Sequence, residues 1–143
     1  MCRNRASQLV DFSKMVFARN ATPTDIDGFI ELDDKFFVFF DLKHENAEKI
    51  QGGQKLAYTR LTNAIHNPDK DKHCITLIAK HSTPVDMDIQ ADDCLVTDCY
   101  FNGVWHNVCK EGARLKEYID EFVKNGCPSI TEQPSKTLNE LLQ

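Results

Sequence analysis

The spacing of apolar residues predicts a hairpin near the middle of the chain. Alternating polar and apolar residues predict a strand over Asp25–Glu31. The polar stretch Leu32–Lys35 forms a turn, and the Phe- and Val-rich run Phe36–Leu42 predicts its partner strand. Because that run is apolar at nearly every position, we expect a central strand that is covered on both faces.

Helical spacing and turn residues predict the other elements. They are helices over Ala6–Ala18, Gln54–Ile65 and Gly112–Val123, a strand over Cys74–Lys80, and a hairpin of Leu95–Phe101 with Val104–His106 across Asn102-Gly103. Gly126 and Pro128 mark the end of the last helix. This order predicts one α/β domain, with a central mixed sheet flanked by helices, over residues 1–128. Residues 129–143 read as a polar C-terminal tail or a short docked helix.

Length and composition fit a small globular protein. The chain has 143 residues, enough for one hydrophobic core, with 41% hydrophobic and 27% charged residues. No apolar run approaches the roughly 20 residues that cross a bilayer, and the basic N-terminus is not followed by an apolar segment of the signal-peptide type. We therefore expect a cytoplasmic protein without membrane contact.

The net charge of −5 argues against a protein that coats nucleic acid, because such binding depends mainly on neutralising phosphates. It does not exclude a nuclease, whose acidic residues can hold a metal ion.

The six cysteines are expected to be reduced thiols. One alternative is a zinc site formed by Cys94, Cys99, His106 and Cys109. The spacing of these residues lacks the short Cys-x-x-Cys pairs that are typical of structural zinc, which disfavours this alternative.

The candidate chemistry lies at the end of the Phe- and Val-rich strand. Asp41 and Lys43 are two residues apart and therefore point to the same face of a strand. The neighbouring strand can bring Asp25 or Asp27 beside them. Two carboxylates and a lysine can hold a hard divalent cation and activate water, as a metal-dependent phosphodiesterase requires. The competing interpretation is a solvated strand end with a surface ion pair.

These residues resemble the motif of the PD-(D/E)xK nuclease superfamily, which has the restriction-endonuclease-like fold. Asp27 matches its first acid, and Asp41-Leu42-Lys43 matches its second motif fourteen positions later (41 − 27). Gln54 after Gly53 matches the glutamine that opens the next helix in many members. The similarity covers Pro23 to Tyr58.

Two departures accompany the resemblance. Pro23 lies two residues before Asp25 and four before Asp27, which leaves the choice between these two acids open. The first helix offers only Asp11 or Gln8 where many members supply a glutamate.

The resemblance implies a set of roles. Asp27, Asp41 and the Leu42 carbonyl would bind Mg²⁺ or Mn²⁺, while Lys43 and Gln54 would orient water or a phosphate oxygen. The expected function is metal-dependent hydrolysis of DNA phosphodiesters, with DNA as partner and a homodimer as the assembly. The alternative is an inactive module of the same fold that binds a protein or nucleic acid.

Overall fold

The computed structural model describes residues 10–47, 52–108 and 112–130. In these ranges the strands are β1 (Gly28–Leu32), β2 (Phe36–His44), β3 (His73–His81), β4 (Leu95–Phe101) and β5 (Val104–Asn107). The helices are α1 (Gly52–Ile65) and α2 (Leu115–Asn125), with three short 3-10 turns at Ala18–Asn20, Pro68–Lys70 and Ala91–Asp93.

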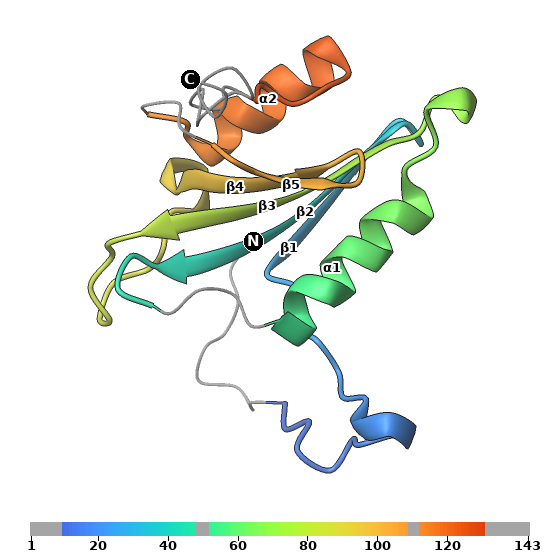
Figure 1. Cartoon of the computed structure of the whole chain (residues 1–143). Helices are drawn as coiled ribbons and strands as arrows, with labels where there is room; N and C mark the ends of the chain where they lie inside the picture. Colours follow the sequence, from blue (N-terminus) through green and yellow to red (C-terminus); the bar gives the residue numbers. More distant parts are fainter. Residues whose placement is uncertain (1–9, 48–51, 109–111, 131–143) are drawn as a thin grey trace, which may run out of the picture.

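The five strands form one mixed sheet in the order β1-β2-β3-β4-β5. The β2–β3 pair is parallel and is connected through α1, whereas the other three pairs are antiparallel. Figure 1 shows α1 on one face of the sheet and α2 on the other. We call these the α1 face and the α2 face. The prediction of an α/β domain with a mixed sheet flanked by helices is confirmed.

Both hairpin turns follow from residues that tolerate a positive φ. Asp33, Asp34 and Lys35 connect β1 to β2, with φ of 56° and 55° at the two aspartates, and Asn102 and Gly103 connect β4 to β5 with φ of 52° and 87°. In the β4–β5 hairpin, a two-residue turn with both φ values positive matches the twist of its strands. Both turns lie where the sequence predicts them.

The core is divided by β2, whose side chains alternate between the two faces. Val38 is fully buried on the α2 face in the cluster that includes Phe122 of α2. Phe39 packs on the α1 face with Tyr58 of α1 and Cys74 of β3. The expectation of a central strand covered on both faces is confirmed.

Polar contacts fix α1 on the sheet. The hydroxyls of Thr62 and Thr76 are buried and lie 2.6 Å apart, which ties α1 to β3. At the β5 edge of the sheet, the Trp105 indole donates to the Thr59 hydroxyl at 3.0 Å. A helix held at both places has little freedom to slide over the sheet.

The predicted helix over Ala6–Ala18 is wrong for its described part. Residues 10–17 are not helical, and the side chains of Val10, Val16 and Phe17 are exposed. A short amphipathic helix depends on burying its apolar face. Here α1 and α2 already cover the two faces of the sheet, so this segment has no core to join.

The two largest boundary differences from the sequence prediction lie at the starts of α2 and β1. α2 begins at Leu115 rather than Gly112 because the preceding residues pair with β4: Val96 N–H donates to the Ala113 carbonyl, and Leu115 N–H donates to the Cys94 carbonyl. β1 begins at Gly28 rather than Asp25. No helix in the described part of the chain is both long and apolar enough to cross a membrane.

Candidate active site

The site forms where β2 extends beyond the start of β1. The β1–β2 ladder begins at the pair Gly28–Phe40, so Leu42 has no partner strand on that side. The Asp27 side chain takes the place of the strand: its Oδ2 accepts a hydrogen bond of 2.7 Å from Leu42 N–H. The N–H and carbonyl of a strand residue leave the same strand edge. The Leu42 carbonyl therefore also lies on the Asp27 side of β2.

Asp41 projects onto the α1 face and is almost completely buried, with 2% of its surface exposed. The Lys43 ammonium lies 3.1 Å from Asp41 Oδ2, so the predicted pairing of these two side chains is present. That contact does not have hydrogen-bond geometry, and Oδ2 is a buried oxygen without a hydrogen-bond partner in the described residues. Lys43 therefore compensates the charge of this oxygen without satisfying it as a hydrogen-bond acceptor, and a buried group in this state is a candidate ligand for a bound ion.

The electrostatics of Asp41 reflect this position. The pKa of Asp41 is raised to about 6, first by burial and then by contact with the Asp27 carboxylate, against the opposing effect of Lys43. Two carboxylates that share a small volume disfavour each other's charge. A cation placed between them would relieve this repulsion.

The beginning of α1 closes the site from the other side. Gln54 Nε2 donates to the Asp25 backbone carbonyl at 3.4 Å, and the Tyr58 hydroxyl donates to the same oxygen at 3.3 Å. Both bonds are long, so either side chain can turn to another acceptor. Burial, followed by the charges of Asp41 and Asp27, raises the pKa of Tyr58 above its ordinary value, so this hydroxyl remains a proton donor.

The structure brings together Asp27, Asp41, Lys43 and the Leu42 backbone, with Gln54 connected to them through Asp25. Asp27, rather than Asp25, supplies the carboxylate beside Asp41, while Asp25 contributes its backbone carbonyl. Sequence reasoning assigned no role to the Tyr58 side chain. The available signal was its position four residues after Gln54, because residues i and i+4 share one face of a helix.

Asp11, the one carboxylate that the N-terminal segment offers as a further ligand, makes no contact with the site in the described residues. Its carboxylate accepts a hydrogen bond from Ser13 N–H within the exposed N-terminal segment. Gln8 lies outside the described residues.

The donor set fits Mg²⁺ or Mn²⁺ in an open site. Mg²⁺ is commonly held by one or two carboxylates, with water and substrate phosphate as the other ligands. Asp27 and Asp41 offer two carboxylates, and the Leu42 carbonyl offers a further oxygen. The described residues contain no group of three His, Cys, Asp or Glu side chains placed for a metal, so they form no closed metal cage.

The zinc alternative gains no support from the described residues. The Cys94 thiol donates to the Gln90 carbonyl, and burial raises the pKa of the Cys99 thiol to about 12. Zinc binds the thiolate form, which these surroundings oppose. Cys109 lies outside the described residues.

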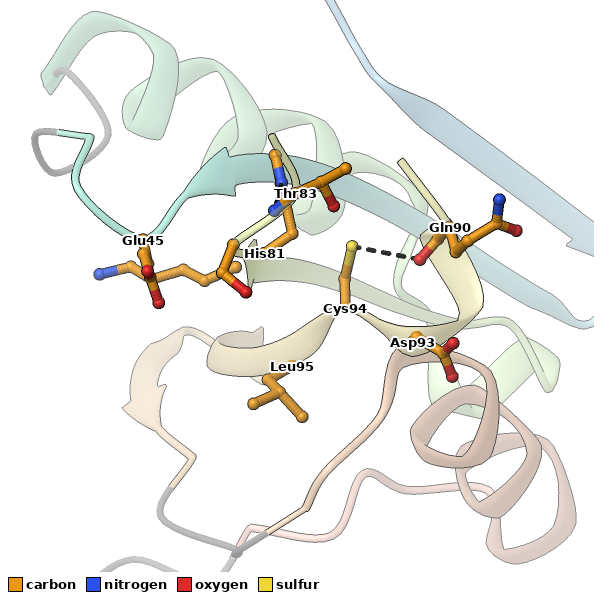
Figure 2. A pocket seen from close by; sticks show the side chains of 9 residues that line it. Glu45, His81, Thr83, Gln90, Asp93, Cys94 and Leu95 are labelled. Carbon is orange, nitrogen blue, oxygen red and sulfur yellow. Dashed lines mark hydrogen bonds between the residues drawn. The ribbon is translucent and has the colours of Figure 1, made fainter. Parts of the chain in front are cut away.

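A hollow of about 340 Å³ opens at the other side of this sheet end (Figure 2). It is lined by Glu45, the end of β3, and the residues around Cys94. His81 Nδ1 accepts a hydrogen bond from Thr83 N–H, and His44 Nδ1 accepts one from Asn46 N–H. Each neutral ring then carries its proton on Nε2 and offers no lone pair there to a metal. Neither Asp27 nor Asp41 lines this hollow.

Searches with this chain against protein-family models, curated proteins and solved structures find no match.

Proposed function

We propose that this protein is a metal-dependent nuclease that hydrolyses DNA phosphodiester bonds. The observation that carries the proposal is the buried Asp41 Oδ2, which has no hydrogen-bond partner among the described residues and lies 3.1 Å from the Lys43 ammonium. A carboxylate in this state, beside a second carboxylate, is suited to a hard cation. A lysine next to it is suited to a phosphate oxygen.

The arrangement of elements supports the same proposal. The β1–β2 hairpin, α1 and β3 follow one another in the chain. β2 pairs with β1 on one side and with β3 on the other, and α1 packs against the sheet. The first acid precedes β1, the Asp-x-Lys motif ends β2, and the glutamine lies in the first turn of α1. This is the order expected of a restriction-endonuclease-like fold, which we propose for this domain.

The metal would be held by Asp27, Asp41 and the Leu42 carbonyl. When bound, Mg²⁺ or Mn²⁺ supplies Lewis acidity toward a phosphate oxygen and lowers the pKa of a bound water. Asp41 must be deprotonated to serve as a ligand, which its pKa of about 6 permits at neutral pH.

Other side chains of the site would position the substrate. The Lys43 ammonium, on the same face as Asp41, would hold a phosphate oxygen or the attacking water. Gln54 and Tyr58 would exchange their long hydrogen bonds to the Asp25 carbonyl for hydrogen bonds to substrate oxygens. Hydrolysis replaces one P–O ester bond by a P–OH bond and releases a sugar hydroxyl.

Cleavage of DNA with Mg²⁺ or Mn²⁺, and its loss in EDTA, tests the proposal. We expect Asp41→Asn and Lys43→Ala each to lower the rate by about a hundredfold or more, the usual effect of removing a group that stabilises charge in the transition state. Asp120→Asn is the matched control, because Asp120 is exposed on α2 and pairs with Lys116. Unchanged cutting by both site variants would contradict the assignment.

Calorimetric titration with Mn²⁺ distinguishes the nuclease from an inactive module of the same fold. We expect saturable Mn²⁺ binding that Asp27→Ala and Asp41→Asn abolish and that Asp120→Asn retains. Absence of Mn²⁺ binding to the wild-type protein, together with absence of cutting, would favour the inactive module.

A further inference from the structure

A second hollow of about 620 Å³ adjoins the candidate active site. Its walls are the segment from Arg19 to Asp25 and the first turns of α1, from Gly53 to Arg60. Figure 1 shows this N-terminal segment close to the first turn of α1. We call it the arginine hollow. It shares Asp25 and Gln54 with the site.

Two guanidinium groups line the arginine hollow without an anionic partner. Among the described residues, neither Arg19 nor Arg60 takes part in an ion pair or a side-chain hydrogen bond. By contrast, Lys35, Lys43 and Lys72 each pair with a nearby aspartate. Asp25 is the one carboxylate in the lining, so two positive charges face one negative charge. The balance favours an anion.

Arg19 lies in a tight turn at the wall of the arginine hollow. Arg19 and Asn20 both have left-handed conformations, with φ of 62° and 59°. Such conformations are uncommon for residues other than glycine, although asparagine adopts them more readily than most. Here the turn is closed by a hydrogen bond of 2.8 Å from Phe17 N–H to the Ala21 carbonyl.

The rest of the lining suits a sugar and a base. Pro23, Leu56 and Ala57 provide an apolar wall, and Asn20 and Thr22 provide polar groups. The volume lies in the range of roughly 300–1,000 Å³ that is typical of small-molecule sites. A base held in a duplex is stacked and paired, and it cannot enter such a hollow without leaving the helix. The hollow therefore fits an unpaired nucleotide.

We propose that the arginine hollow binds an unpaired nucleotide that flanks the scissile phosphate, with Arg19 and Arg60 holding its phosphate. The inference rests on the proposed nuclease function and specifies its substrate as DNA with a single-stranded segment. The shared Gln54 and Asp25 place the flanking nucleotide directly beside the residues assigned to hydrolysis.

Fluorescence anisotropy with a labelled oligothymidylate of about 12 nucleotides, within the usual range of single-strand site sizes, tests this proposal in EDTA. Each phosphate contact with a single strand contributes about 0.7 to the slope of log affinity against log salt concentration. We therefore expect Arg19→Ala and Arg60→Ala each to reduce the affinity about fivefold at roughly 0.1 M salt and to lower the slope by about 0.7.

Lys124→Ala is the charge-matched control, because Lys124 is exposed on α2, at the opposite face of the sheet. It should keep the wild-type affinity. A blunt duplex of the same length should bind more weakly than the single strand and respond less to the arginine substitutions. Equal loss in the control and the arginine variants, preference for the duplex, or no binding of oligothymidylate by the wild-type protein would each overturn the proposal.

The two proposals fail in different ways. If Asp41→Asn abolishes cutting while the arginine variants keep full affinity, the nuclease function stands and the nucleotide subsite is wrong. If the arginine variants lose affinity while the wild-type protein cuts no DNA with Mg²⁺ or Mn²⁺, the subsite stands and the nuclease function is wrong.

Discussion

At the scale of single residues, Asp41 is the position where stability and the proposed chemistry conflict. Its carboxylate is buried, one of its oxygens has no hydrogen bond to the described residues, and the neighbouring Asp27 is also acidic. Residues that oppose the fold in this way are characteristic of functional sites.

The raised pKa of Asp41 predicts how stability changes with pH in the absence of metal. The folded protein holds this proton up to about pH 6, whereas the ordinary value is 3.8. Between these values the folded state binds more protons than the unfolded state, so the free energy of unfolding falls as pH rises. Two pKa units correspond to an upper bound of about 3 kcal/mol.

Urea unfolding in EDTA at several pH values measures this effect. The comparison of wild type with Asp41→Asn isolates the contribution of Asp41 from all other titrations. We expect Asp41→Asn to be more stable than wild type at pH 7 and to lose that advantage near pH 4. If Asp41→Asn exceeds wild type in stability by the same amount at pH 7 and near pH 4, Asp41 does not titrate in this range.

At the scale of elements, the sequence predicted the parts that depend on local chemistry. Asn102-Gly103 and Asp33-Asp34 occupy turns with a positive φ, and the Phe- and Val-rich run became an interior strand of the sheet. The pairing of Asp41 with Lys43 followed from strand periodicity alone.

Other features could not be read from local patterns. The segment around Val10 and Phe17 has helical spacing but finds no surface on which to pack, which depends on how α1 and α2 cover the sheet. The choice between Asp25 and Asp27 depended on where β1 begins relative to Leu42. Tyr58 and the arginine hollow arise from contacts between distant segments.

The start of β1 also provides a test of the site geometry. A Cβ at Gly28 would lie 1.9 Å from the Phe40 ring, so Gly28→Ala forces that ring or the strand to move. We expect a loss of about 1–3 kcal/mol in stability, as for other overpacked positions. Because Asp27 precedes Gly28 directly, we also expect weaker Mn²⁺ binding.

Phe40→Leu removes part of the clashing ring and serves as the partner substitution. In the double variant, Mn²⁺ affinity by calorimetry should recover toward that of Phe40→Leu alone. A double-mutant cycle with no coupling between the two positions would show that the clash does not set the position of Asp27.

At the scale of the whole molecule, the two faces of the sheet have different tasks. The α2 face carries the larger apolar core, which includes Val38, Leu77 and Phe122. The α1 face carries the candidate site and the polar contacts that hold α1. Substitutions in α2 should therefore change stability without altering the chemistry.

A single site in a small domain cuts one strand, whereas a double-strand break needs two cuts. For cutting both strands in the duplex part of a DNA substrate with a single-stranded segment, we predict a two-fold homodimer, because its symmetry matches that of duplex DNA. One candidate surface is the β4–β5 hairpin, where Val104 is exposed; the other, around Leu138, Leu141 and Leu142, lies outside the described residues. Light scattering should give twice the chain mass of 16.3 kDa, and a mass of one chain with and without DNA would contradict the dimer.

The hydrogen bond from Leu42 N–H to Asp27 Oδ2 makes one backbone amide a reporter of the site. A short bond to a charged acceptor moves an amide proton to low field in an NMR spectrum, and it shifts again when the charge on that acceptor changes. Titration of Asp41, arrival of a cation or displacement of Asp27 would each alter this resonance. The occupancy of the site can thus be followed in solution by the frequency of one proton, before any substrate has been identified.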